Sequence, residues 1–225
     1  MAEPSPSPVR LRIDFVSDVV CPWCAVGLAS LEQALERTRG EVEAEIHFQP
    51  FELNPDMPPE GEDAVGHLQR KYGMPAEQMD ANQQAIVERG AALGFPFDMD
   101  KRQRIYNTFD AHRLLHWAQT QGRQRELKHA LLRAYFTEGR NVSDHGTLAA
   151  IAASAGLPEE GAREVLASGA WADEVRIGER FFQSHGIRSV PAVILERKHL
   201  ISGGQPVEVF EQALRQVAAS LGSPA

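Results

Sequence analysis

Two cysteines separated by two residues are the side chains in this chain best suited to chemistry. Cys21 and Cys24 are the only cysteines among its 225 residues, and Pro22 and Trp23 stand between them. A two-residue gap lets both sulfurs lie on one turn at a helix N-terminus, close enough to form a bond. There the first sulfur is expected to face outward, beside free backbone N–H groups and the positive helix end, which favour thiolate. We therefore expect Cys21 to be the nucleophile and Cys24 the resolving thiol.

Two other interpretations of the cysteine pair are an incidental pair and half of a zinc site. A four-cysteine site is excluded because no other cysteine exists. A site of two cysteines and two histidines could use His112 and His116, which lie four residues apart on an expected helix. They are much further from Cys24 than the compact spacing of a zinc finger allows. A redox-active dithiol is favoured, and no metal ligand set is expected.

The residues around the pair adjust the reactivity of the first sulfur. Pro22 suits the first turn of a helix, where its missing N–H has no partner to lose. Trp23 is neutral, so it cannot stabilise a thiolate by charge. Asp18 lies three residues before Cys21, and its negative charge would oppose ionisation of the thiol if the two are close.

The second candidate element is Val190-Pro191, directly before the apolar run 192–195. A proline at the first residue of a strand removes no interior ladder hydrogen bond, so it can be a simple strand-entry residue. An X–Pro bond is cis in only about 5–6% of cases in folded proteins. The upstream cysteine motif and the downstream hairpin and helix raise the expectation of a cis bond at Pro191.

Hydrophobic periodicity predicts the elements that position these residues. Alternation at Leu11, Ile13 and Phe15 indicates a strand before the cysteines, and apolar residues at helical spacing follow them. A second strand is expected over 42–51. Successive helices follow to residue 185, including a long one over 101–121 and one capped by Ser143. A hairpin over 192–202 and a terminal amphipathic helix complete the chain.

Composition excludes two classes of partner. The chain carries 31 acidic and 23 basic residues, a net charge of −8 and a sequence pI near 5.5, so no nucleic-acid partner is expected. No window approaches the roughly 18 unbroken apolar residues of a membrane span. Residues 1–8 read as a disordered leader without the features of a secretory signal. We therefore expect a cytoplasmic protein, in which a static structural disulfide is improbable.

Taken together, these motifs resemble the DsbA-like branch of the thioredoxin superfamily, and more closely its FrnE-type subgroup. The resembling segments span most of the chain from residue 11 to 218: 18–24, 51–55, 107–114, Val190-Pro191 and 202–206. The resemblance implies an α/β thioredoxin fold, βαβ…ββα, interrupted by a large all-helical insertion. The expected domains are residues 9–57 with 186–225, and 58–185 for the insertion. It further implies that Cys21 attacks, Cys24 resolves, and Pro191 is cis and packs against them.

The chain departs from the subgroup in two ways. The subgroup usually has an aromatic residue after the second cysteine, whereas Ala25 stands here, so the lining of the site can differ. Some relatives carry an additional cysteine pair, and this chain has none. Its active site would therefore be reset by another molecule.

The expected function is that of a thiol–disulfide oxidoreductase acting on protein or small-thiol disulfides. It would need no bound cofactor, glutathione is a candidate recycling thiol, and the protein would be a monomer or homodimer. One alternative is a glutathione-dependent isomerase or transferase, which needs only one thiol or hydroxyl at the helix start. A second is a non-catalytic zinc- or protein-binding module. His112 and Arg113 are more typical of helix packing than of substrate contact.

Overall fold

A four-stranded sheet forms the centre of the structure, a computed structural model that describes residues 7–58 and 60–222. Most of the leader expected over 1–8 lies outside these residues, and Ser7 and Pro8 belong to no helix or strand. The elements in chain order are β1 (Val9–Ser17), α1 (Pro22–Arg37), β2 (Val42–Pro50), β3 (Glu62–Asp63), α2 (Ala64–Tyr72), α3 (Ala76–Ala92), β4 (Arg104–Ile105), α4 (Phe109–Thr120), α5 (Gln124–Phe136), α6 (His145–Ser154), α7 (Glu159–Ala167), α8 (Ala172–Ser184), β5 (Ala192–Leu195), β6 (His199–Ser202) and α9 (Val207–Gly222).

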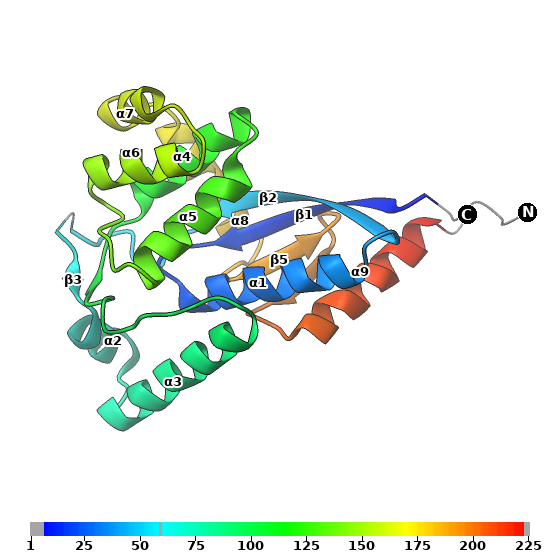
Figure 1. Cartoon of the computed structure of the whole chain (residues 1–225), viewed down its shortest axis with the longest axis horizontal. Coiled ribbons are helices and arrows are strands. Elements are labelled where there is room, and N and C mark those ends of the chain that lie inside the picture. Colours follow the sequence, from blue (N-terminus) through cyan, green and yellow to red (C-terminus); the bar gives the residue numbers. More distant parts are fainter. Residues whose placement is uncertain (1–6, 59, 223–225) are drawn as a thin grey trace, which may run out of the picture.

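The order of strands in this sheet is β2-β1-β5-β6. β1 pairs in parallel with β2 from Val9↔Val42 to Ser17↔Pro50, and β5 pairs antiparallel with β1 and β6. A parallel pair needs a crossover connection, which α1 provides. Helices α1 and α9 lie together over one face of the sheet (Figure 1). The expected order βαβ…ββα is confirmed.

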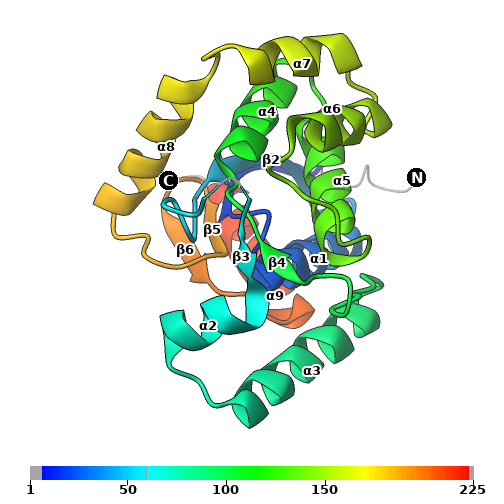
Figure 2. The ribbon, with the colours of Figure 1, turned by 90° about the vertical axis from the view of Figure 1, so that its left-hand side faces the viewer.

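The chain between β2 and β5 forms the insertion, which Figure 2 shows spread around one end of the sheet. Helices α4 to α7 lie above, α2 and α3 below, and α8 at the left of that view. The insertion is not all helical, because β3 and β4 pair antiparallel through Glu62↔Ile105 and Asp63↔Arg104. Two-residue strands carry no alternating pattern, so periodicity could not reveal them.

The helix expected over 101–121 begins eight residues late. Ile105 is buried beside Met57 and Ala64 instead of following a helical stripe. The Arg104 guanidinium donates to the carbonyls of Glu60 and Gly61. These contacts hold the segment extended until α4 starts at Phe109. The cap of α6 was also predicted one residue early, since it is Asp144, and not Ser143, whose carboxylate accepts from the Thr147 N–H at 2.7 Å.

The main hydrophobic core runs without a break from the sheet into the insertion. Phe15 and Phe48 of the sheet lie in the same cluster as Leu114 of α4 and Leu131 of α5. A second, smaller cluster lies near the start of β5. Its buried members are Val16, Phe51, Phe182, Ile187 and Ala192, and the half-buried Leu53, Val190 and Ile194 pack against them.

The turn before α9 packs tightly against the start of α1. A Cβ atom added to Gly204 would lie 2.9 Å from the carbonyl oxygen of Trp23 and 3.4 Å from the Gly27 nitrogen. Both neighbours are backbone atoms, so they cannot rotate away as a flexible side chain could. The residue after Gly203 must therefore lack a side chain for the turn to reach α1.

We expect Gly204→Ala to lower the free energy of unfolding by about 1–3 kcal/mol, the usual cost of overpacking. Gly169→Ala is the control, because an added Cβ at Gly169 meets nothing within 4 Å, and its effect should stay within about 0.5 kcal/mol. Urea denaturation measures both. Equal stabilities of the two variants would contradict the packing described here.

Candidate active site

The two cysteines lie at the start of α1, as the motif predicts. Cys21 is the N-cap residue in an extended conformation, with φ −92° and ψ 112°, and Pro22 is the first residue of the helix. The cysteines are 3.3 Å apart and not bonded. At the N-cap, the Cys21 sulfur lies near the positive end of the helix, which favours a negative charge.

Both cysteines are buried, but not equally. Cys21 keeps 4% of its surface exposed and Cys24 keeps none. The expectation that the first sulfur faces outward is therefore too simple, since Cys21 is itself almost completely buried. A partner sulfur can reach Cys21 first, and Cys24 only through Cys21.

The Val190–Pro191 segment lies directly beside Cys21. The peptide bond between these two residues is cis, and the Val190 carbonyl lies 3.7 Å from the Cys21 sulfur, at hydrogen-bonding distance for a thiol. A Cβ at Gly27 would be 3.0 Å from the Pro191 ring, so the proline packs closely on α1. The structure thus brings Val190 and Pro191, distant in sequence, to the cysteine pair.

Trp23 lies between the cysteines and remains half-buried. The Arg89 guanidinium of α3 lies 5.7 Å from the centroid of its ring, within the range of a cation–π contact. The insertion therefore reaches the active-site turn from the α3 side.

A buried lysine beneath the pair was not predicted from the sequence. Lys128 of α5 is 1% exposed. Burial lowers the pKa of its ammonium group, while the negative charges available at Cys24, Asp18 and Cys21 oppose that shift. It lies next to Leu127 and four residues before Leu132 on the buried face of α5. A charged residue on an apolar helical stripe is the signal that could have identified it.

Lys128 acts on the resolving thiol. Burial is the largest cause that raises the pKa of the Cys24 thiol well above its ordinary value, and Cys21 raises it further. Lys128 and a backbone hydrogen bond with Asp18 lower it in part. The lysine thus offsets some of the cost of forming a thiolate in a site away from water.

Asp18 completes the buried charges below the sulfurs. One of its oxygens accepts from the Leu53 N–H at 2.7 Å. Its other oxygen lies 3.5 Å from His112 Nε2, close enough for an ion pair but without the direction of a hydrogen bond. Burial would raise the pKa of Asp18, but His112, the Leu53 N–H and Thr108 together lower it. His112 is therefore part of the site's lower layer, contrary to the expectation of simple helix packing.

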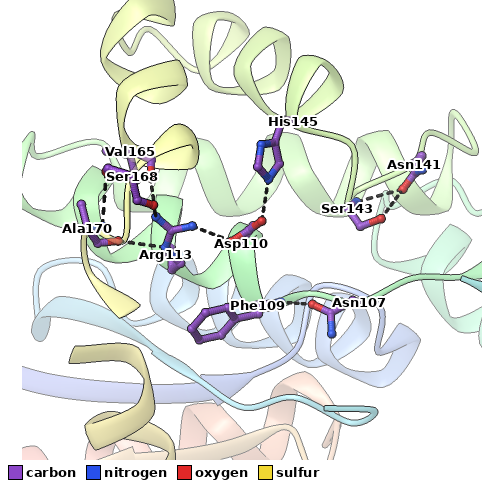
Figure 3. Close-up of polar contacts among 10 residues, drawn as sticks. All are labelled: Asn107, Phe109, Asp110, Arg113, Asn141, Ser143, His145, Val165, Ser168 and Ala170. Atoms are coloured by element: carbon purple, nitrogen blue, oxygen red, sulfur yellow. Dashed lines mark hydrogen bonds and ion pairs between the residues drawn. The ribbon is translucent and has the colours of Figure 1, made fainter. Parts of the chain in front are cut away.

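Arg113, the neighbour of His112, has a structural position. Its guanidinium donates to the carbonyl of Val165 in the last turn of α7, to those of Ser168 and Ala170 just after this helix, and to Asp110 at 2.7 Å (Figure 3). Asp110 in turn pairs with His145. These contacts join α4 to the end of α7.

The C-terminal end of α2 carries two residues whose pKa values respond to the charge of Cys21. Lys71 donates at 2.7 Å to the Leu53 carbonyl and to the Asn54 side chain. Burial lowers the pKa of Lys71, while the negative charges at Asp18 and Cys21 oppose this shift. Burial, with a smaller effect of Cys21, raises the pKa of the half-exposed Tyr72. The cation of Lys71 and the phenol of Tyr72 thus lie within the electrostatic reach of Cys21.

Within residues 7–58 and 60–222, no group of three or more His, Cys, Asp or Glu side chains is arranged to hold a metal ion. The zinc interpretation of the cysteines therefore gains no support from neighbouring ligands. In the same part of the chain, no helix combines the length and the apolar character needed to cross a membrane.

Comparison with known proteins gives a match over nearly the whole chain. Residues 12–215 match the model of the DSBA-like thioredoxin domain family. A probable DsbA oxidoreductase from Streptomyces coelicolor is 38% identical, with a TM-score of 0.88 over 96% of this chain and 92% of the other. The protein YwbO of Bacillus subtilis is 26% identical over 208 residues, 92% of this chain and 96% of its own length.

A more distant structure shares the fold alone. The cytosolic disulfide reductase DsbM from Pseudomonas aeruginosa, solved with GSH, is 18% identical, with a TM-score of 0.64 over 93% of this chain and all of the other.

We expect Lys128→Met to raise the pKa of the Cys24 thiol further, because a nearby positive charge is lost. Carbon-13 NMR of the Cys24 Cβ against pH, in a Cys21→Ser background, measures this directly. Lys101→Met is the matched control, because Lys101 pairs with Asp98 at the surface. Superimposable titrations of the two variants would contradict the role of Lys128.

Proposed function

We propose, from the premise that this chain belongs to the DSBA-like thioredoxin domain family, that it is a thiol–disulfide oxidoreductase working through Cys21 and Cys24. The observation that carries this proposal is the approach of the two cysteines to 3.3 Å at the start of α1. Two sulfurs so placed need only a small movement to form a bond of about 2.05 Å.

In the reductive direction, the Cys21 thiolate attacks one sulfur of a substrate disulfide. The substrate S–S bond breaks, the leaving thiolate takes a proton, and a mixed disulfide joins Cys21 to the substrate. The Cys24 thiol then loses its proton and attacks the Cys21 sulfur. This releases the second substrate thiol and leaves a Cys21–Cys24 disulfide, so two electrons pass to the substrate. The reverse sequence oxidises a substrate dithiol.

The surroundings of the pair support these separate roles. Of the two cysteines, only Cys21 has exposed surface, so it attacks the substrate. The completely buried Cys24 then attacks the mixed disulfide. Lys128 stabilises the Cys24 thiolate that must form for release. The segment at Val190 and Pro191 lies at the edge of Cys21, where an extended substrate could pair with its backbone.

The oxidised or reduced pair must be reset by an external thiol or disulfide, because the chain has no third cysteine. We propose that the partners are protein or small-thiol disulfides and that glutathione is a recycling thiol. Lys71, within the electrostatic reach of Cys21, offers a cation for an acidic thiol. A glutathione-dependent isomerase or transferase would use Cys21 without Cys24, so the pair speaks against it. Location in the cytoplasm and the oligomeric state stay predictions.

We expect Cys24→Ser to accumulate covalent mixed disulfides with substrate, because Cys21 still attacks and nothing releases the product. Cys21→Ser should accumulate none. Non-reducing electrophoresis with mass spectrometry, after incubation with insulin whose disulfides are intact, measures the trapped species. Circular dichroism establishes that both variants fold.

The opposite results would contradict these roles in different ways. Trapping by Cys21→Ser alone would exchange the attacking and resolving cysteines. Absence of trapping in both variants would overturn the exchange mechanism. Glutathione-dependent turnover that survives in Cys24→Ser would favour the isomerase or transferase alternative.

A further inference from the structure

Two buried carboxylates share one arginine where the chain leaves β2. Glu52 and Glu179 of α8 are each only 5% exposed. Arg176 Nη1 donates to Glu52 Oε1 and, at 2.8 Å, to Glu179 Oε2. The remaining oxygen of each carboxylate is buried and has no hydrogen-bond partner. Two buried carboxylates therefore face a single, partly exposed arginine.

Other charged groups near this cluster are engaged elsewhere. On α4, the Phe109 ring lies 3.9 Å from the Arg176 guanidinium carbon and fixes it by a cation–π contact. Asp110 and Arg113 pair with each other, and His112 faces Asp18. None of these relieves the second negative charge at Glu52 and Glu179.

Retention of one proton by the pair of carboxyl groups removes the second negative charge. Two carboxylates that share a site cannot both ionise easily. Burial, followed by the charge of Glu179, raises the pKa of Glu52 to about 8, and Arg176 lowers it only in part. A carboxyl group retained at neutral pH can donate an O–H to the neighbouring carboxylate. One proton thus supplies a partner to oxygens that otherwise have none.

This cluster borders the active site on two sides. The next residue along the chain, Leu53, donates its N–H to Asp18 and accepts from Lys71 through its carbonyl. On the other side, α8 leads into the segment that ends at the Val190–Pro191 bond. Phe182 of α8 lies in one hydrophobic cluster with Phe51, and Val190 packs against this cluster. A link between Glu52 and α8 therefore joins the two segments that lead to Leu53, which binds Asp18, and to Val190, which contacts Cys21.

We propose that Glu52 and Glu179 form a shared-proton clasp that positions the 51–55 segment and α8 around Cys21, and that alkaline loss of this proton loosens the hold of these two segments on the site. Both are positioning residues, since neither touches a sulfur. The existence of the shared proton does not depend on the proposed function. Its effect on turnover does rest on the proposed function.

The first experiment detects the proton itself by carbon-13 NMR of the glutamate carboxyl groups against pH. We expect one wild-type resonance to titrate near pH 8, this transition to be absent from Glu52→Gln, and to move to lower pH in Glu179→Gln, which keeps the burial of Glu52 but removes the neighbouring charge. Glu41→Gln is the control, because Glu41 pairs with Arg215 at the surface, and it should keep the transition. Titration of all glutamates in their ordinary acidic range would overturn the proposal.

The second experiment measures stability on the same variants. The folded state holds a proton that the unfolded chain loses above the ordinary glutamate pKa of 4.5, so the stability contribution falls as pH rises towards about 8. The urea midpoint of the wild type should fall more over this range than that of Glu52→Gln. Parallel profiles would overturn the shared proton.

The third experiment compares insulin reduction by the wild type and by Glu179→Gln, whose neutral amide keeps a donor at every pH. The ratio of the variant rate to the wild-type rate should rise by about tenfold one pH unit above the midpoint, where about nine tenths of the wild type has lost the proton. A ratio that stays constant with pH would overturn the positioning role. If the wild type reduces no insulin at any pH but the NMR transition is present, the proposed function is overturned and the shared proton is still supported.

Discussion

Charges and thiols buried together below the start of α1 constrain the arrangement of this molecule. Cys24 and Asp18 have no exposed surface, and Lys128 has almost none. A buried charge is tolerated when opposite charge and hydrogen bonds compensate its lost hydration. Here Asp18 comes from the loop after β1, whereas Lys128 and His112 come from the insertion. The site is therefore balanced only when the insertion is folded against the sheet.

The hydrophobic core enforces that condition. Leu114 and Leu131 of the insertion belong to the same cluster as Phe15 of the central strand. Separation of the insertion from the sheet would expose this core and would also separate Lys128 from the negative groups at Cys24 and Asp18. The insertion is thus part of the active-site scaffold. The clasp of Glu52 and Glu179 likewise balances buried carboxylates, in the segments that lead to the active site.

The sequence predicted those parts of the fold that depend on local patterns. The alternation through Leu11 and Phe15 located β1, and the spacing of Cys21 and Cys24 located the start of α1. Val190-Pro191 was found because a proline directly before an apolar strand is a local signal. These features require only the residues next to them.

The remaining features depend on residues distant in sequence. Lys128 is recognisable as buried only from its place on an apolar helical face, and Asp18, one of the negative groups that act on its pKa, lies 110 positions earlier in the chain. Glu179 lies on α8 and meets Glu52 through tertiary packing that no periodicity encodes. The short strands β3 and β4 are set by their pairing and not by their own sequence, which is why the insertion was expected to be all helical.

The central claim is that Cys21 and Cys24 exchange reversibly between a dithiol and a disulfide. Equilibration of the protein in a series of glutathione redox buffers, followed by alkylation and mass spectrometry of the intact chain, tests it most directly. The account predicts one two-electron transition in which both thiols disappear together and reappear on reduction. Cysteines that stay reduced in every buffer, or a stable glutathione adduct on Cys21 with Cys24 still free, would contradict it.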